Sequence, residues 1–95
     1  MAEVLLSPLA ESDLQEIWLS IAAENRTAAD RFLRPLTARI ASLAEFPGIG
    51  SPRPELAPNA RILVEGKYLV IYEPVERGVE VVRVLHGARN LPELF

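Results

Sequence analysis

The sequence has no cysteine and only one histidine among its 95 residues. Without cysteine, the chain can form no disulfide framework, no thiolate metal site and no cysteine nucleophile. With one histidine, a transition-metal site would have to rely on carboxylates. The sequence also contains neither a phosphate-binding loop nor the Ser, His and Asp ordering of a hydrolase. We therefore expect no metal and no cofactor.

Long apolar runs are also missing. No segment approaches the roughly 20 residues that a membrane-spanning helix needs. The opening stretch MAEVLLSPLAESD lacks the basic region of a signal peptide. The net charge of −3 argues against a general phosphate-binding surface. We expect a soluble, cytoplasmic protein that has no membrane contact and no direct sequence-specific binding to nucleic acid.

The composition is typical of a globular protein, with 49% hydrophobic and 24% charged residues. A chain of this length forms one domain, and such a domain buries only roughly 60 to 65% of its unfolded surface. We expect a single domain over residues 1–95 whose own stability is modest. A partner that covers apolar surface would therefore add substantially to that stability.

The N-terminal half predicts a short edge strand followed by a helix. The strand is the apolar run from Glu3 to Leu6. Ser7 is a good N-cap, and Pro8 fits the first helical position, where its missing N–H costs nothing. An apolar stripe at helical spacing then continues to near Asn25, and we expect it to face the core; it comprises Leu14, Ile17, Trp18 and Ile21.

A second helix is predicted directly after the first, so that the two form a helical hairpin. Thr27, with Asp30 three residues later, resembles a capping box that would start it. Pro35 removes one backbone hydrogen bond. It predicts a kink without a break, because the apolar stripe keeps its phase across the proline. That stripe, which we expect to be buried, comprises Ala29, Phe32, Leu33, Leu36, Ile40 and Leu43.

The C-terminal half predicts three antiparallel strands after a constrained loop. The loop, residues 47–59, contains four prolines and two glycines, which restrict its conformations. A two-residue type II′ turn at 66–67 suits the glycine there, and it pairs Arg61 with Tyr72. We expect the next turn to centre on residues 76–78.

This register sorts the strand residues onto two faces. One face is entirely apolar, and we expect the helical hairpin to cover it as the core; it comprises Ile62, Val64, Leu69, Ile71, Val82 and Val84. The other face mixes apolar residues with tyrosines and arginines, and we expect function there; it comprises Arg61, Leu63, Glu65, Tyr68, Val70, Tyr72, Val81, Arg83 and Leu85.

The arginines of this half are candidates for a binding surface. The register places Arg61 opposite Tyr72, and we expect Arg83 and Arg89 near them. Guanidinium groups can bind phosphate or carboxylate groups through two hydrogen bonds and can stack on aromatic rings. The alternative is that each arginine pairs with an acid on a solvated sheet face, the nearby acids being Glu65, Glu73 and Glu80.

His86 ends the last strand, and strand alternation places it with Val82 and Val84 near the rim of the core. Two roles remain open for it. It is either a structural, hydrogen-bonded histidine, which the sequence favours, or a group that contacts a partner or transfers a proton.

Several stretches, taken in order, resemble the ParE/RelE superfamily of type II toxins, and within it the ParE branch. They span nearly the whole chain and read LSPLAESDLQEIWLSIAAEN, AADRF, LAEFPGIGSPRPEL, GKYLVIYEP and RVLHGARNLPELF. The resemblance implies an α+β fold in βααβββ order, in which an N-terminal αα-hairpin packs on one face of a small antiparallel sheet. This order agrees with the one that periodicity predicts.

The resemblance also implies a function. It implies a toxin that inhibits bacterial growth, serves in plasmid stabilization, and is held inactive in a hetero-oligomer with a co-expressed ParD-like antitoxin. ParE-type toxins poison DNA gyrase, whereas RelE-type toxins cut mRNA in the ribosomal A site. The resemblance to the ParE branch therefore implies gyrase as the target.

One position separates the two activities. RelE-type cleavage uses a tyrosine near the C-terminus for acid–base work, and Phe95, which has no ionisable proton, falls at that position. We therefore expect a gyrase inhibitor that is not an enzyme. One alternative is a ribosome-dependent endoribonuclease, for which Arg61 and Arg89 match basic positions and His86 supplies a proton. Another is a non-toxic module that only binds an antitoxin. The surface that we expect to contact target or antitoxin comprises Arg61, Tyr72, Arg83, His86, Arg89 and Phe95.

Overall fold

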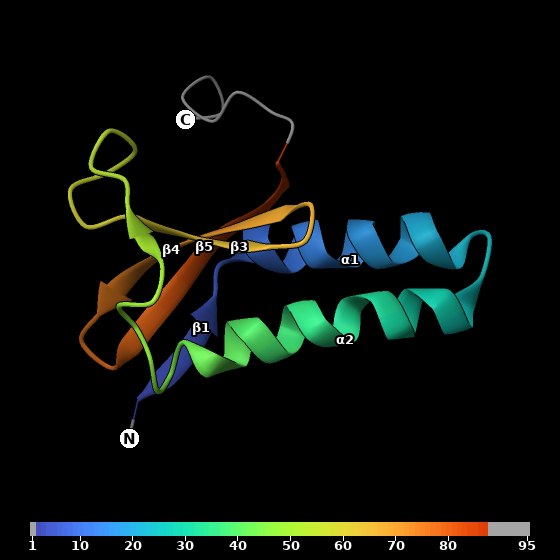
Figure 1. Ribbon diagram of the computed structural model, residues 1–95, viewed down its shortest axis with the longest axis horizontal. Helices are drawn as coiled ribbons and strands as arrows, with labels where there is room; N and C mark the ends of the chain where they lie inside the picture. Colours follow the sequence, from blue (N-terminus) through green and yellow to red (C-terminus); the bar gives the residue numbers. More distant parts are fainter. Residues whose placement is uncertain (1, 88–95) are drawn as a thin grey trace.

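The computed structural model describes residues 2–87, which form two helices and five strands (Figure 1). In chain order these are β1 (Glu3–Leu6), α1 (Pro8–Ala22), α2 (Arg26–Ser42), β2 (Ser51–Pro52), β3 (Arg61–Glu65), β4 (Tyr68–Val75) and β5 (Gly78–His86). The predicted βααβββ order is confirmed, and β2 is a short addition from the loop. Within the described range, neither helix is long and apolar enough to cross a membrane.

The sheet has the strand order β1-β5-β4-β3-β2 and is mixed. Strands β2 to β5 pair antiparallel with their neighbours, whereas β1 runs parallel to β5, with Glu3 opposite Gly78 and Leu6 opposite Val81. Parallel strands require a long crossover, and the chain between β1 and β5 supplies it. As far as Val81, β5 therefore has a neighbouring strand on each side.

The β3–β4 hairpin has the predicted register. Arg61 lies opposite Tyr72, and Glu65 lies opposite Tyr68. Gly66 has a φ of +58°, and no non-glycine residue of the described chain has a positive φ. A type II′ turn requires a positive φ at the first of its two central residues and a negative φ at the second. The predicted turn is therefore confirmed.

The β4–β5 hairpin differs from the prediction in two places. Residues 76–77 alone connect the strands, and farther along a β-bulge inserts Val82 as an extra residue. A bulge reverses the side-chain alternation beyond it. Val81 therefore lies on the predicted face, whereas Val84 joins the cluster under the helices and Leu85 joins the opposite one. The predicted faces of Arg83, which lies opposite Ile71, and of Val84 and Leu85 were wrong for this reason.

The helices cover the face that carries the tyrosines, so the predicted sides of the sheet are reversed. The main core comprises Ala10, Leu36, Ile40, Leu43, Leu63, Val70, Tyr72, Val79, Val81 and Val84. The all-apolar face holds a smaller cluster, built from Ile62, Ile71 and Leu85 with Leu56 and Leu69 at its edge. The prediction failed because it treated tyrosine as a surface residue. A tyrosine ring is apolar, and its hydroxyl can be buried once it has hydrogen-bond partners.

Both helices begin with a capping side chain, but only the first cap was predicted correctly. Ser7 accepts a hydrogen bond from the first turn of α1, and Pro8 is the first helical residue. At α2 the cap is Asn25, not Thr27, because the helix begins directly after the short link from α1. Pro35 lies inside α2 without breaking it, as predicted.

A buried hydroxyl fastens the loop after α2 to the sheet. Oη of Tyr72 accepts from the Gly50 N–H at 2.8 Å and donates to the Pro47 carbonyl at 2.7 Å. Beside it, Nη1 of Arg61 donates to the carbonyls of Gly48 at 3.1 Å and Gly50 at 2.6 Å. These four hydrogen bonds hold the first part of the loop against β3 and β4.

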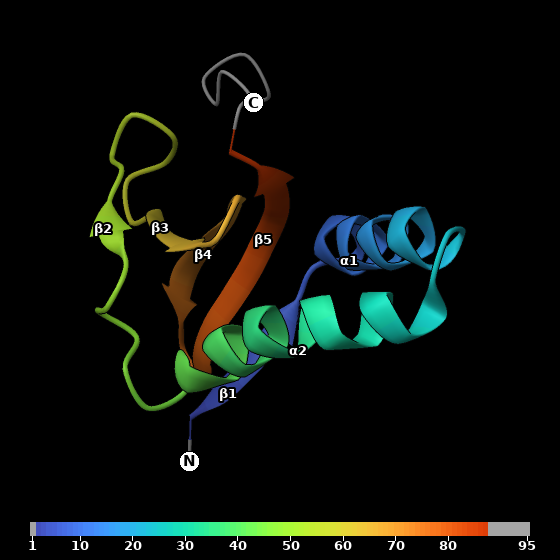
Figure 2. The ribbon, with the colours of Figure 1, turned by 45° about the vertical axis from the view of Figure 1, so that its right-hand side comes forward.

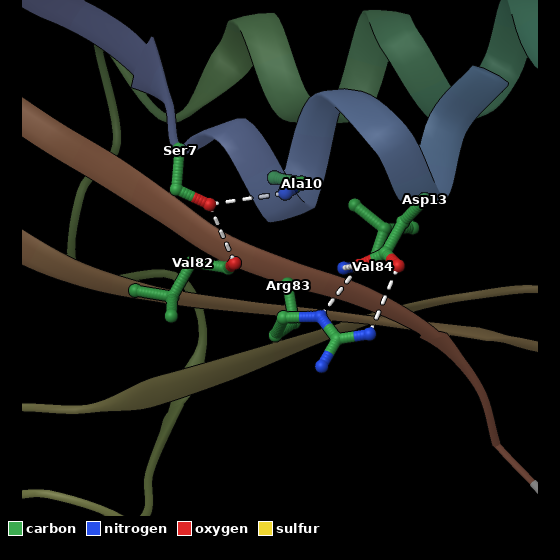
Figure 3. Close-up of polar contacts among 6 residues, drawn as sticks. All are labelled: Ser7, Ala10, Asp13, Val82, Arg83 and Val84. Atoms are coloured by element: carbon green, nitrogen blue, oxygen red, sulfur yellow. Dashed lines mark hydrogen bonds and ion pairs between the residues drawn. The ribbon is translucent and has the colours of Figure 1, made fainter.

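Beyond Val81, β1 no longer pairs with β5, and α1 supplies hydrogen bonds to the strand edge instead (Figure 3). The Ser7 hydroxyl donates to the Val82 carbonyl at 2.7 Å. The Val84 N–H donates to Oδ2 of Asp13 at 2.9 Å. The first turns of α1 therefore take the place of a neighbouring strand, with one hydroxyl and one carboxylate as partners of the backbone.

Asp13 also binds the guanidinium group of Arg83. Its two carboxylate oxygens accept from Nε at 2.8 Å and from Nη2 at 3.0 Å (Figure 3). This hydrogen bonding with Asp13 raises the pKa of Arg83 above its ordinary value, although desolvation acts in the opposite direction. Arginine stays charged at physiological pH in any case, and the two hydrogen bonds to Asp13 connect β5 to α1.

Replacement of Gly50 by alanine tests the attachment of the loop. A Cβ atom there would lie 2.7 Å from the Tyr72 ring and hydroxyl, and 2.9 Å from the Ile62 carbonyl. We expect Gly50→Ala to lower the free energy of unfolding, measured in urea, by about 1–3 kcal/mol, the usual cost of overpacking. Gly48→Ala is the matched control, because a Cβ at that position meets nothing within 4 Å. Equal unfolding midpoints for the two variants would contradict the attachment.

Replacement of Asp13 by alanine tests the connection between α1 and β5. The change leaves a charged guanidinium and a backbone N–H without their acceptor, so we expect a loss of about 2–4 kcal/mol in unfolding free energy. Urea denaturation followed by the fluorescence of Trp18 measures it. Glu16→Ala is the control, because Glu16 accepts no hydrogen bond from the described residues, and it should change stability by less than about 0.5 kcal/mol. Similar losses in both variants would rule out the role assigned to Asp13.

Candidate functional site

The helical hairpin projects well beyond the sheet, as Figure 2 shows. The 17 residues of α2 make a helix about 25 Å long, whereas the five residues of β3 span only about 17 Å. Where the hairpin projects, a groove lies between it and the ends of β4 and β5. We call this the hairpin groove.

The groove consists of two adjoining hollows that share Tyr68. The first, of about 370 Å³, lies between α1 and β5 and is lined by Asp13, Glu16, Ile17, Ser20, Tyr68, Arg83, Val84, Leu85 and His86. The second, of about 430 Å³, lies between α2 and the β3–β4 turn and is lined by Ala28, Arg31, Phe32, Pro35, Leu36, Glu65, Gly66 and Tyr68. Hollows of this size accommodate side chains of a bound segment.

Three aromatic rings form a row along the groove. Phe32 of α2 and Tyr68 of β4 meet edge to face, with ring centroids 5.8 Å apart, and Tyr68 meets His86 of β5 in the same way at 5.7 Å. Such pairs contribute about 0.5–1.5 kcal/mol each beyond their apolar contact. The row therefore has a defined shape, although the Phe32 residue remains 46% exposed.

The two helices that wall the groove carry opposite charge. α1 contains three acids and no base, whereas α2 contains four arginines and one acid. Arg39 of α2 lies 3.3 Å from Glu65, measured from Nε to Oε1. Arg31, on the wall of the groove, has no ion pair with any residue of the described chain. The groove thus offers an acidic wall along α1 and an unpaired cation on α2.

Two of the predicted site residues, Arg83 and His86, line the hairpin groove. Arg83 is bound by Asp13, so its partner is an acid of α1 and not a neighbour on the sheet face. His86 is exposed at the end of β5 and packs against Tyr68, on the same face as Val84. Its functional role stays a prediction.

The other predicted site residues lie elsewhere. Arg61 and Tyr72 hold the loop after α2, and neither lines the groove. The strands that carry Arg61 and Arg83 are separated by β4. The two guanidinium groups bind different elements: Arg61 binds the loop after α2, and Arg83 binds α1. Arg89 and Phe95 lie outside the described residues.

Sequence reasoning missed the residues that give the groove its aromatic surface. Phe32 was predicted as core, and this was wrong, because its ring packs edge to face on Tyr68 of β4 while the residue stays 46% exposed over the groove. Trp18, also predicted as core, is only half-buried, and its indole N–H donates to Asp30 at 2.9 Å. Helical periodicity alone does not separate these two residues from the buried members of the same stripes.

The groove suits the binding of a peptide segment. Residues 2–87 contain no group of three or more His, Cys, Asp or Glu side chains that could hold a metal ion. The groove instead presents aromatic and apolar surface bordered by acids and by Arg31. An amphipathic helix that lays its apolar face into a groove is a common partner for such a surface.

Comparison with known proteins identifies the family. The family model of the ParE toxin of the type II toxin-antitoxin system parDE matches residues 4–91. The chain is 36% identical over 88 residues to Toxin ParE1 of Caulobacter vibrioides, covering 90% of this chain and 88% of that protein. It is 37% identical over 84 residues to Toxin ParE1 of Mycobacterium tuberculosis, covering 86% of each.

A solved structure has the same fold. A chain from the chromosomal ParDE TA system of P. aeruginosa superposes with a TM-score of 0.75, covering 90% of this chain and 96% of that chain at 16% sequence identity. At 16% identity this match supports the fold alone. The assignment to a family rests on the family model and on the two ParE1 relatives. From residue 4 to residue 91, the chain therefore belongs to the ParE family, the toxins of parDE type II toxin–antitoxin systems.

Proposed function

We propose that this ParE-family toxin inhibits bacterial growth in the cytoplasm by binding DNA gyrase, without catalysis of its own. We further propose that a ParD-like antitoxin neutralises it by occupying the hairpin groove. The gyrase target follows from the resemblance to the ParE branch, since ParE-type toxins act on gyrase. The family match supports this choice.

One observation carries the preference for binding over RNA cleavage. Arg61, which matches a basic position of the nuclease relatives, donates to the carbonyls of Gly48 and Gly50. A turn of this guanidinium toward an RNA phosphate would cost both bonds, which are two of the four that hold the loop after α2. Phe95 adds to the preference, because it has no proton for acid–base catalysis.

The antitoxin part of the proposal is supported by the groove. Its aromatic row, the exposed ring of Phe32 and the unpaired Arg31 suit an amphipathic segment that brings apolar side chains and a carboxylate. The solved P. aeruginosa structure, described as a ParDE TA system, supports pairing of a similar fold with an antitoxin. A small domain with an open apolar groove would also gain stability when a partner covers it.

Purified toxin should abolish the supercoiling of relaxed plasmid by DNA gyrase when it is in excess, or trap gyrase on cleaved DNA. A titration read on agarose gels measures the concentration for half-inhibition. A parallel reaction with translating ribosomes and primer extension on the mRNA is the control, and it should show no toxin-dependent cuts. Normal supercoiling at excess toxin would eliminate gyrase as the target, and cuts in the mRNA would favour the endoribonuclease.

Replacement of Phe32 by serine tests the groove as the antitoxin site. Loss of an aromatic anchor in an interface typically costs about 1–2 kcal/mol or more, so we expect antitoxin affinity to fall roughly tenfold or more in calorimetric titrations. Leu19→Ser is the matched control, because Leu19 is 53% exposed on α1 but does not line the groove. If both variants bind the antitoxin as tightly as the parent toxin, the antitoxin occupies another surface.

A further inference from the structure

The loop after α2 exposes two large apolar residues close together. Phe46 is 57% exposed and Ile49 is 48% exposed. The Ile49 N–H donates to the Phe46 carbonyl at 3.1 Å, so the two residues are the first and fourth of a turn with Pro47 and Gly48 in its middle. The ends of a β-turn lie within about 7 Å of each other between Cα atoms. Both residues therefore belong to one patch of surface.

This turn is fastened to the sheet from the inner side. The buried Tyr72 binds Pro47 and Gly50, and Arg61 binds Gly48 and Gly50. A loop that is already held by four hydrogen bonds loses little further conformational freedom when it meets a partner. Exposed aromatic and aliphatic residues on a preorganised support are suited to act as anchors in a protein interface.

Two arginines, Arg61 bound to the turn and Arg53 directly after β2, have no acidic partner among the described residues. Within residues 2–87, the side chain of Arg61 donates only to carbonyls of the loop, and that of the exposed Arg53 donates only to the carbonyl of Pro52, at 2.9 Å. Glu45 and Glu55 belong to the same stretch, yet no ion pair joins them to an arginine within the described residues. The charge of these guanidinium groups therefore favours a partner that supplies carboxylates.

We propose that Phe46, Ile49, Arg53 and Arg61, here called the turn surface, form the contact with the toxin's protein target, to which Arg61 adds only the charge of a guanidinium that the loop carbonyls hold in place. The target presents an apolar pocket bordered by carboxylates. This inference rests on the proposed function for the existence of such a target. It goes beyond that function because it assigns target and antitoxin to different surfaces of the toxin.

The two surfaces are separate in the structure. No residue of the turn surface lines the hairpin groove. In Figure 2 the chain between α2 and β2 runs on the side of the sheet away from the projecting end of the hairpin. Neutralisation then results from the bulk of the bound antitoxin and not from competition for the same residues.

The double variant Phe46→Ser, Ile49→Ser tests the turn surface. The concentration of toxin for half-inhibition of gyrase supercoiling should rise about 30-fold or more, as expected when two anchors of an interface are lost. Antitoxin affinity should stay within about twofold of the parent toxin, and the melting temperature should not fall. Val64→Ser is the matched control, because Val64 is 57% exposed on β3, outside the turn surface, and it should inhibit like the parent.

Arg53→Gln tests the charge of the turn surface without touching the fastened turn. Inhibition should weaken about threefold to tenfold, and it should depend less on salt concentration than inhibition by the parent toxin. If the double variant proves unstable, inhibition by Arg53→Gln decides whether the turn surface contacts the target. This variant should fold like the parent, because within the described residues the side chain of Arg53 binds only the carbonyl of Pro52.

The outcomes separate this inference from the proposed function. If the parent toxin inhibits gyrase and the stable double variant inhibits it equally well, the turn surface is not the target contact. Loss of antitoxin binding in the double variant would likewise overturn the assignment. If the parent toxin leaves gyrase unaffected, the proposed target is wrong. The turn surface is then tested by inducing the parent toxin and the double variant separately in bacteria and comparing how strongly each inhibits growth. Equal growth inhibition by the two would overturn the turn surface for any target.

Discussion

The hydroxyl group of Tyr72 is the constraint on which much of this small fold depends. The ring lies fully buried in the main core, between the helices and the sheet, and a buried hydroxyl without partners would cost about 1–3 kcal/mol. Pro47 and Gly50 supply those partners. The requirement therefore connects the core to the loop, and Gly50 is needed because a side chain there would collide with the ring.

Asp13 meets a similar requirement near the opposite edge of the sheet, where β1 ends. Where β1 ends, the backbone of β5 still needs hydrogen-bond partners, since unpaired backbone groups away from water are costly. Ser7, the N-cap of α1, and Asp13 within that helix provide these partners. Asp13 also binds Arg83. Polar residues that stand out in the sequence, such as Arg61, Tyr72 and Arg83, are thus occupied with holding elements together. The exposed anchors of the candidate binding surfaces are instead apolar and aromatic, namely Phe32, Phe46 and Ile49.

The small size of the domain explains why binding surfaces remain exposed. A domain of this length buries a smaller share of its surface than a larger one, and one end of the hairpin extends past the sheet (Figure 2). The uncovered part of α2 exposes Phe32 above the groove, while the fastened loop exposes Phe46 and Ile49 elsewhere. A ParE-family toxin built in this way presents two separate apolar surfaces on one small support.

Local features were predictable from the sequence alone. They include both helices, the Ser7 cap, the pairing of Arg61 with Tyr72 and the likeness to ParE toxins. Each depends on residues near one another in the chain or on an ordered set of motifs. The tertiary structure alone decided which sheet face is core, where the bulge shifts β5, and that Phe32 is exposed. It also decided that Arg61 binds loop carbonyls. These outcomes depend on how distant segments share a limited apolar area and satisfy buried polar groups, which no short stretch of sequence contains.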